Sequence, residues 1–422
     1  MRSLPRWLVL FVLSASIYGQ STTAPAGLVV HEWGTFTSMQ GSDGLSLEGL
    51  HHEEEALPAF VYNRSEIRDC PLRAHGWKGL EVPATHVTQK METPVIYFYT
   101  AKPLSARVRV DFVKGLITQW YPVSDLLGPP EGAKDAGPLD FRKIDRSFLQ
   151  WDLRLIPDDG KELAPDLPSV GDDHPWALAR RTRAAFVETK ARQGPARQGP
   201  VEAEKYLFYR GLGTFDLKLT ATTSGERSTL VNGLGQPVPR AFAVEIKDGR
   251  GACRDLGAIA PDTDSAFDFR EARRLDLDSF VVELRKAVAT ALVDDGGLYA
   301  DEAEAMTATW ARQWFRTPGR RIIYLLPRPL VDQLLPLSIE PKPETLVRVL
   351  VGRLEMILPE TERAVERALK ARKSDDRSAR AAAERELAAL DRFLEPHVRR
   401  VLAATKDKEV AASAAEILTT LK

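Results

Sequence analysis

The chain has 422 residues, of which 44% are hydrophobic and 28% are charged, and its formal net charge at pH 7 is −1. This length is enough for two or three globular domains. A nearly neutral chain lacks the basic surface that binding to phosphate backbones requires, so we expect no nucleic acid partner. Every apolar run is shorter than the roughly 20 residues that a membrane-spanning helix needs, so we also expect no transmembrane segment.

The N-terminal residues 1–19 have the pattern of a cleavable signal peptide. Arg2 and Arg6 precede an unbroken apolar stretch at 7–13, and small or polar residues follow it up to Gly19. We therefore predict cleavage after Gly19 and export of the mature chain, to a periplasm or to the extracellular space. The alternative is that this segment stays on the chain as an uncleaved anchor.

Residues 28–260 are predicted to form a β-rich domain. Its clearest strand is 106–112, where apolar and charged residues alternate as in an antiparallel strand that is buried on one face. The segment 157–200 predicts a long loop with one short helix near 176–190, because proline and glycine interrupt it repeatedly. Further strands are expected at 28–36, 94–100, 116–121, 148–156, 206–209, 215–221, 228–232 and 240–246.

Helical periodicity begins after residue 275. We predict an α/β segment at 275–373 and a helical tail at 376–422. The expected elements of the α/β segment are helices at 277–292 and 300–315, a buried strand at 321–326, a strand or helix at 346–357, and a helix that begins at Pro359. The predicted fold class is therefore α+β: an N-terminal β-rich, sandwich-like region, then an α/β segment and a helical C-terminal tail.

Histidine and glutamate are concentrated in the first β region. Imidazole and carboxylate groups are ligands of zinc and of other divalent transition metals, so this region predicts a metal site. The chain has no H-E-x-x-H or C-x-x-C motif that would specify the ligand set. The candidate ligands are His31, His51, His52, His86 and Glu55, and the candidate catalytic carboxylates are Glu32 and Glu92.

Local geometry restricts how these residues can combine. Neighbours in a strand point to opposite faces, so His31 and Glu32 are not expected to bind one ion together. If residues 51–55 are helical, each of the two histidines can meet a glutamate three or four positions later. A metal held there should bind less tightly as the pH falls through the histidine range near about 6.5. The alternative is a solvated acidic face with structural hydrogen bonds.

Two other features leave alternatives open. Met306, Trp310 and Trp314 could line a sugar pocket, because tryptophan stacks on apolar faces, or they could belong to the core. Cys70 and Cys253 could form a disulfide in an oxidising compartment or remain two unrelated buried thiols.

Two common classes of catalytic motif are excluded. No G-x-S-x-G nucleophile elbow is present. The glycine pairs at 211–213 and 233–235 lack the further glycine and the lysine of a phosphate-binding loop.

Three segments of the chain resemble a group of uncharacterised exported bacterial proteins. They are the motif HEWGTFTS at 31–38, the motif KMETP at 90–94, and the stretch 314–337 with its WF, PG, PR and LPL elements. The resemblance extends from about residue 28 to 360 and excludes the tail. It implies export and no particular chemistry.

Two functions are compatible with this pattern. The first is an extracytoplasmic binding or envelope-assembly protein that holds a divalent transition metal through the His/Glu cluster, with an envelope protein or a polysaccharide as its partner. The alternative is a metal-dependent hydrolase of an envelope or extracellular polymer, with histidine ligands and a glutamate as general base.

Overall fold

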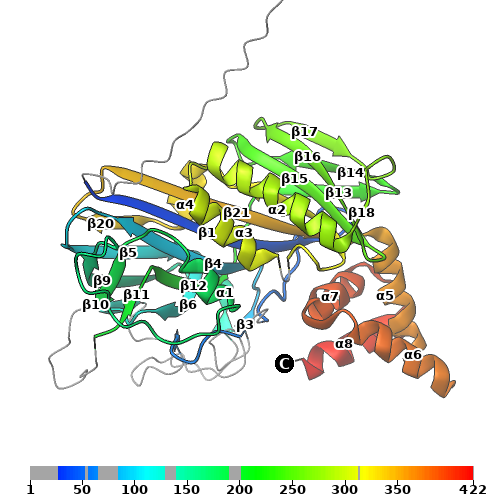
Figure 1. Ribbon diagram of the computed structural model, residues 1–422. Coiled ribbons are helices and arrows are strands. Elements are labelled where there is room, and N and C mark those ends of the chain that lie inside the picture. Colours follow the sequence, from blue (N-terminus) through cyan, green and yellow to red (C-terminus); the bar gives the residue numbers. More distant parts are fainter. Residues whose placement is uncertain are drawn as a thin grey trace, which may run out of the picture.

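A computed structural model of the protein describes residues 27–52, 56–64, 84–128, 139–189, 201–311 and 314–421. The fold is α+β, as predicted, with large β-sheets followed by C-terminal helices (Figure 1). The predicted signal peptide at 1–19, the candidate ligand Glu55 and Cys70 lie outside these residues. Within the described ranges, no helix is long and apolar enough to cross a membrane.

A ten-stranded sheet forms the centre of the molecule. Strand β1 (Val29–Gln40), near the middle of this sheet, is buried along its whole length. It pairs in parallel with β21 (Thr345–Met356) and antiparallel with β4 (Gln89–Tyr99). In order across the sheet, the strands are β18 (Leu275–Asp276), β16 (Arg250–Ile259), β15 (Val238–Lys247), β19 (Gly319–Leu325), β21 (Thr345–Met356), β1 (Val29–Gln40), β4 (Gln89–Tyr99), β12 (Leu207–Gly213), β6 (Gly115–Tyr121) and β2 (Tyr62–Asn63).

Three smaller sheets accompany the central one. The six-stranded sheet contains β11 (Ala203–Glu204), β10 (Phe186–Thr189), β9 (Arg146–Ile156), β5 (Leu104–Val113) and β20 (Leu337–Glu340), with β7 (Leu126–Gly128) also paired to β9. The three-stranded sheet contains β13 (Leu219–Ser224), β14 (Arg227–Asn232) and β17 (Asp264–Phe267). The two-stranded sheet contains β3 (Ala84–Thr85) and β8 (Leu139–Asp140), and the 3₁₀ turn η2 (Phe141–Lys143) follows it.

The two faces of the central sheet are covered differently. One face packs against the six- and three-stranded sheets, because apolar residues of all three sheets share one core. The other face packs against helices, because strand residues such as Trp33 and Val95 share a second core with helical residues such as Leu284 and Met306. The helices on that face are α1 (Pro175–Ala179), α2 (Leu277–Asp294) and α3 (Ala300–Trp310), whereas α4 (Arg328–Leu334) contributes to the first core.

The predicted β-rich domain and α/β segment share the central sheet. Strands β19 and β21 of the α/β segment lie between β15 and β1, so the boundary near residue 260 does not separate two sheets. The ambiguous segment 346–357 lies largely in β21, where pairing with both β1 and β19 selects the strand. The predicted helix at 176–190 was too long: it ends at Ala179, and β10 at Phe186–Thr189 pairs with β9 instead.

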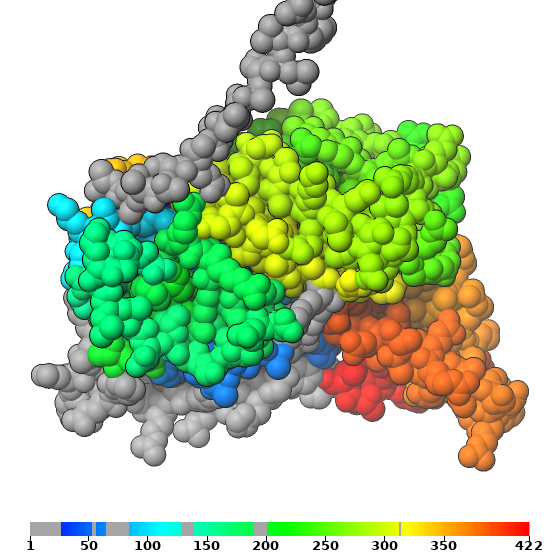
Figure 2. All heavy atoms as spheres, in the orientation of Figure 1, coloured from blue at the N-terminus to red at the C-terminus, as the bar shows by residue number. Residues whose placement is uncertain are grey.

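The C-terminal helices form a core of their own. They are α5 (Pro359–Ala371), α6 (Arg377–Ala388), α7 (Leu394–Ala404) and α8 (Lys408–Thr420), with the 3₁₀ turn η3 (Asp391–Phe393) before α7. They occupy one end of the molecule (Figure 2, orange to red). Arg400 of α7 connects them to the turn after β1, because its guanidinium lies 2.9 Å from Asp43. The same guanidinium lies 2.8 Å from Glu362 of α5.

Candidate metal centre

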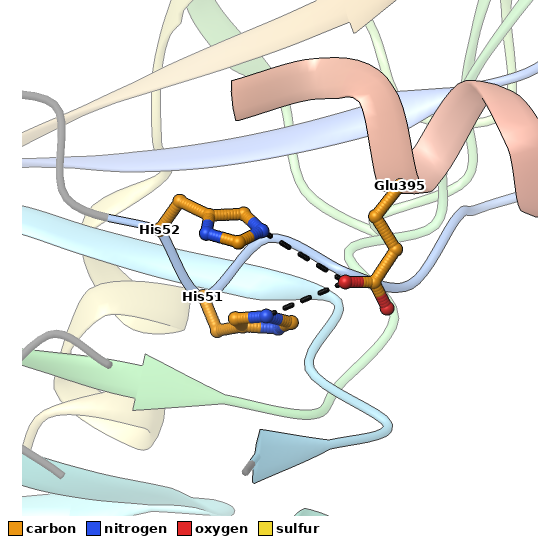
Figure 3. A group of neighbouring side chains, drawn as sticks. All are labelled: His51, His52 and Glu395. Atoms are coloured by element: carbon orange, nitrogen blue, oxygen red, sulfur yellow. Dashed lines mark ion pairs between the residues drawn. The ribbon is translucent and has the colours of Figure 1, made fainter. Parts of the chain in front are cut away.

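His51, His52 and Glu395 come together between the loop after β1 and helix α7 (Figure 3). The Nε2 atom of His51 lies 3.4 Å from Oε2 of Glu395, and Nε2 of His52 lies 3.8 Å from the same oxygen. The two imidazole rings are neighbours, with 4.3 Å between their centroids. The three side chains therefore present one ligand atom each to a common point.

The local backbone explains why both histidines face the helix. Gly49 has φ +99, and residues 51 and 52 belong to neither a helix nor a strand. The condition of a helix, under which each histidine would meet a later glutamate, is therefore not met at these two residues. A Cβ at Gly49 would lie 2.9 Å from Cγ of Glu395, so a glycine is required for the loop to approach α7 this closely.

Glu395 is a candidate ligand that sequence analysis missed. It lies in the first turn of α7 and is buried, and Arg399 one turn later holds its Oε1 atom at 2.7 Å. Oε1 is thus occupied by an arginine, while Oε2 faces the two imidazoles. The sequence contains no signal for this role, since Glu395 lies in a segment that was expected to be a separate tail.

Burial determines the charge states of the cluster. Desolvation lowers the pKa of His51 from 6.5 to about 4, although Glu395 opposes the shift. Burial by itself raises the pKa of Glu395, but its interactions with His52, His51 and Arg399 outweigh this effect and lower the pKa to about 2. At neutral pH His51 is therefore a neutral imidazole and Glu395 is a carboxylate, and these are the forms that bind metal ions.

The distance between His51 and Glu395 is compatible with a shared ion, and the distance between His52 and Glu395 is longer. Both nitrogen–oxygen separations exceed the roughly 2.7–3.2 Å of an N–H···O hydrogen bond. A tetrahedral zinc ion with bonds of about 2.0–2.1 Å places its ligand atoms about 3.3 Å apart. Two histidines and one glutamate are also a known zinc ligand set, in which the fourth position is left to water or substrate.

The other predicted ligands do not join this cluster. Nδ1 of His31 lies 2.7 Å from Oε2 of Glu302 on α3, against the helical face of the central sheet. Nδ1 of His86 lies 2.8 Å from Oε1 of Glu48 in a half-exposed pair. Each of these histidines thus has a separate carboxylate partner.

The two predicted catalytic carboxylates also lie elsewhere. Glu32 points to the face of the sheet opposite His31, as strand geometry requires, and binds Tyr209 and Arg348. Glu92 lies on β4, where Nζ of Lys90 is 3.0 Å from its Oε1 atom.

Three further polar side chains, those of Arg328, Arg353 and Cys253, lie in structural ion pairs or in the core. Arg328 pairs with Asp332, and Arg353 with Glu355, so these arginines are ion-pair partners. Cys253 lies on β16, where burial raises the pKa of its thiol to about 12, with a further contribution from Asp255. This thiol is therefore protonated at neutral pH.

We expect the titration of His51 to make the protein less stable in mild acid. Its pKa is lowered in the folded state, so between pH 6.5 and about 4 the unfolded chain binds the proton more readily. Stability should be fully retained above pH 6.5 and fall by about 3 kcal/mol as the pH drops to 4. Urea unfolding at several pH values would measure this, with His51→Asn expected to have a shallower slope. Equal slopes for the two proteins would contradict the prediction.

Comparisons with known proteins add no functional information. No protein-family model matches the chain, and no curated protein is similar to it in sequence. Among solved structures it is similar to the Fcho1 Mu homology domain of Danio rerio with bound Eps15 peptide, at 7% identity and a TM-score of 0.25, over 78% of this chain and 95% of that chain. The yeast delta-COP-I mu-homology domain complexed with a Dsl1 WxWxV peptide is similar at 8% identity and a TM-score of 0.24, over 78% and 96%. Likenesses this low carry no argument about what this chain does.

Proposed function

We propose that this chain is an exported metal-binding protein whose centre consists of His51, His52 and Glu395. The observation that carries the proposal is the convergence of these three groups, with ligand atoms that all lie within 4.8 Å of one another. Zinc suits the two imidazoles and one carboxylate best, and other divalent transition metals are accommodated by the same donors.

The ion would join two parts of the fold. His51 and His52 follow the central strand β1, whereas Glu395 belongs to the C-terminal helices, which have a separate core. A metal ligated from both sides holds them together more strongly than the ion pair between Arg400 and Asp43 does alone. We therefore assign the ion a structural role in docking these helices.

Export is supported by the signal-like pattern of Arg2, Arg6 and the apolar stretch that follows. An exported binding protein of this kind would act on a partner in the cell envelope, either a protein or a polysaccharide. An intact-mass measurement of the exported protein tests this part of the proposal, because the mature chain should begin at Gln20.

Hydrolysis at the metal is the second candidate function. It is favoured by one observation, namely that three protein ligands leave a fourth position open for water. A hydrolytic centre also requires a general base beside that water. Among the described residues, the charged side chains outside the cluster with the largest influence on the pKa of His51 are Arg399 and Lys90, which are cations. A structural or binding role therefore agrees better with these surroundings.

Metal titration of the mature protein tests the proposal directly. After treatment with a chelator, the protein should bind one equivalent of Zn²⁺ in isothermal calorimetry, and its melting temperature should rise. At a free zinc concentration 100 times Kd, the expected stabilisation is about 2.7 kcal/mol. His51→Ala/His52→Ala and Glu395→Gln should each lose both the binding and the thermal shift.

Matched controls separate loss of a ligand from general damage. His397→Gln changes another buried histidine of α7, and Glu384→Gln changes an exposed carboxylate of α6, so both variants should bind zinc as the unmodified protein does. The proposal fails if the unmodified protein takes up no zinc, copper, nickel or manganese. It also fails if the double histidine variant retains the thermal shift.

A further inference from the structure

A cleft lies between strands β16 and β17, on the side of the molecule away from the six-stranded sheet (Figure 1). Its volume is about 510 Å³, within the roughly 300–1,000 Å³ that is typical of ligand sites. It is lined by residues 254–256 of β16, residues 266 and 267 of β17, and Asp268, Arg270 and Glu271 of the segment that follows. Half of these side chains are exposed, so the cleft is open to solvent.

The cleft follows the edges of the two strands rather than their faces. Neighbouring residues of a strand point to opposite faces. Phe267 is buried and Ala266 is exposed, yet both line the cleft. The three consecutive residues 254–256 of β16 line it as well. A space that side chains from both faces of a strand reach lies along the edge of that strand, where its main-chain N–H and C=O groups are presented.

Both edges lack a strand partner at the cleft. On its outer side, β16 pairs with β18 only at Arg250 and Gly251. β17 pairs with β14 and is the last strand of its three-stranded sheet. In the part of the chain that the structure describes, no further main-chain segment forms a hydrogen bond with residues 252–258 or 264–267. Main-chain donors and acceptors at these edges are therefore available to another chain.

Hydrogen bonds at the turn between the strands keep the two edges apart. Asn232 at the end of β14 is fully buried, and its Nδ2 donates to the carbonyl oxygens of Ile259 at 3.0 Å and Ala260 at 3.1 Å. The N–H of Asp262 donates to the carbonyl oxygen of Asn232 at 2.8 Å. These bonds direct the chain from β16 into another sheet, so β17 pairs with β14 and not with β16.

The edge of β17 is better suited to an added strand than that of β16. Proteins protect exposed edges with bulges and charged residues, among other devices. The register of β16 against β15 shifts near Gly257, which has φ +67, and Oδ1 of Asp255 accepts the N–H of Gly257 at 2.9 Å. β17, in contrast, pairs with β14 in an unbroken register and contains no lysine or proline.

The strands that form the cleft carry an excess of acidic residues. Residues 254–271 include five acidic and two basic side chains. Arginines neutralise two of the acids, at 2.5 Å from Asp255 and at 2.8 Å from Asp268. The other three are exposed and form no ion pair with any described residue: Asp262, Asp264 and Glu271. Of the two bases, Arg270 is the partner of Asp268, and Arg254 donates to the main-chain oxygen of Asp268 at 3.1 Å. This balance favours a basic partner.

We propose that the cleft binds an extended basic segment of a partner protein, which adds as a strand to the edge of β17. The main chain of the segment would pair with Asp264–Phe267, and alternate side chains would contact Leu256 and Phe267. Basic side chains would lie near Asp264 and Glu271. A second copy of this chain fits less well, because the edge of β17 lies inside the cleft and two recessed edges cannot meet.

This inference deepens the proposed binding function, on which it rests, by assigning it a protein partner. It does not depend on the metal ion, because no residue that lines the cleft is one of the three metal ligands.

A labelled peptide, Lys-Val-Lys-Val-Lys, tests the proposal in titrations followed by fluorescence anisotropy. It should bind at least about tenfold more tightly than Glu-Val-Glu-Val-Glu, because the unpaired charges of the cleft are acidic. A preference for the glutamate peptide would overturn the assignment of a basic partner. No binding of the lysine peptide would overturn the site.

N-methylation of the same peptide tests main-chain pairing. The N–H groups of alternate residues in a strand point to opposite sides, so either the lysines or the valines supply the donors to β17. Of two peptides that are N-methylated on all lysines or on all valines, one should bind at least about tenfold more weakly than the parent, since it loses two or three hydrogen bonds. The other should bind like the parent. If both bind like the parent, pairing with a strand edge is refuted.

Variants of the protein locate the bound peptide. Ala266→Trp should lower the affinity for the lysine peptide at least about tenfold without lowering the melting temperature, because the exposed Ala266 lines the cleft. Ala101→Trp, at an exposed turn after β4, is the matched control and should change nothing. Glu271→Gln should weaken binding and its dependence on salt, whereas Glu340→Gln on the exposed surface of β20 should not. Unchanged binding by Ala266→Trp would place the peptide elsewhere and refute the proposal.

A chelator separates this inference from the metal proposal. Peptide binding should be the same with and without the chelator. If zinc does not bind but the lysine peptide does, the metal proposal alone fails. If zinc binds and the peptide does not, the peptide site alone fails.

Discussion

Replacing Glu32 by glutamine should lower the free energy of unfolding by about 3–5 kcal/mol, since it breaks a buried ion pair from one side. Glu32 is fully buried, and one of its oxygens binds the hydroxyl of Tyr209 while the other binds Nε of Arg348. The Arg348 side chain is itself almost inaccessible to solvent. Among the described residues, Asp332, at 2.8 Å, would be the carboxylate left to pair with its charge.

This experiment also decides between the two roles that Glu32 has been given. A general base would be dispensable for folding, so a Glu32→Gln protein of unchanged stability would restore the catalytic interpretation. The control is Glu340→Gln on β20, whose side chain is 72% exposed and 3.9 Å from Arg107. Surface pairs of this kind contribute little, so that variant should stay within about 0.5 kcal/mol of the unmodified protein. Urea denaturation measures both.

Gly211→Ala is expected to destabilise the protein by about 3 kcal/mol, because the new methyl group has no space. Gly211 lies in β12 opposite β6, and a Cβ there would overlap the carbonyl oxygen of Leu116 and lie 2.9 Å from its carbonyl carbon. These are backbone atoms of the neighbouring strand, so no side-chain rotation relieves the clash. The two strands would have to separate within the central sheet.

A substitution at a second glycine, Gly171, is the control for the steric clash at Gly211. Gly171 has nothing within 4 Å of a Cβ, and its φ is not in the left-handed region. Gly171→Ala should therefore be neutral or stabilising by about 0.4–1 kcal/mol, through the reduced entropy of the unfolded chain. Thermal unfolding of both variants checks the prediction. A Gly211→Ala protein as stable as Gly171→Ala would show that β6 and β12 are not held at this distance.

Local pattern was enough to predict most of the regular elements. Alternation of apolar and charged residues at 106–112 specified β5, which is antiparallel to β9. The helical periodicity after residue 275 specified α2, whose buried residues lie on one face. Both signals are local, because a strand or a helix buries a face that its own sequence defines. For the same reason the sequence separated His31 from Glu32, which the structure places on opposite faces of β1.

The sequence was a weaker guide for segments whose secondary structure depends on pairing with another strand. The segment 346–357 fits a strand or a helix, and pairing with β1 and β19 decides for the strand. The short strand β10 at Phe186–Thr189 forms because it pairs with β9, whereas the sequence pattern predicted a helix there. Local propensity is weak compared with a complete ladder of hydrogen bonds to a neighbouring strand.

The candidate sites show the same division. The sequence by itself identified His51 and His52 as candidate metal ligands, because the chemistry of imidazole does not depend on the fold. Only the tertiary structure brought Glu395 to them. The physical reason is that contacts between segments far apart in the chain arise from the packing of whole sheets and helices. The spacing of residues within one segment therefore does not predict which side chain of a distant segment will lie beside them.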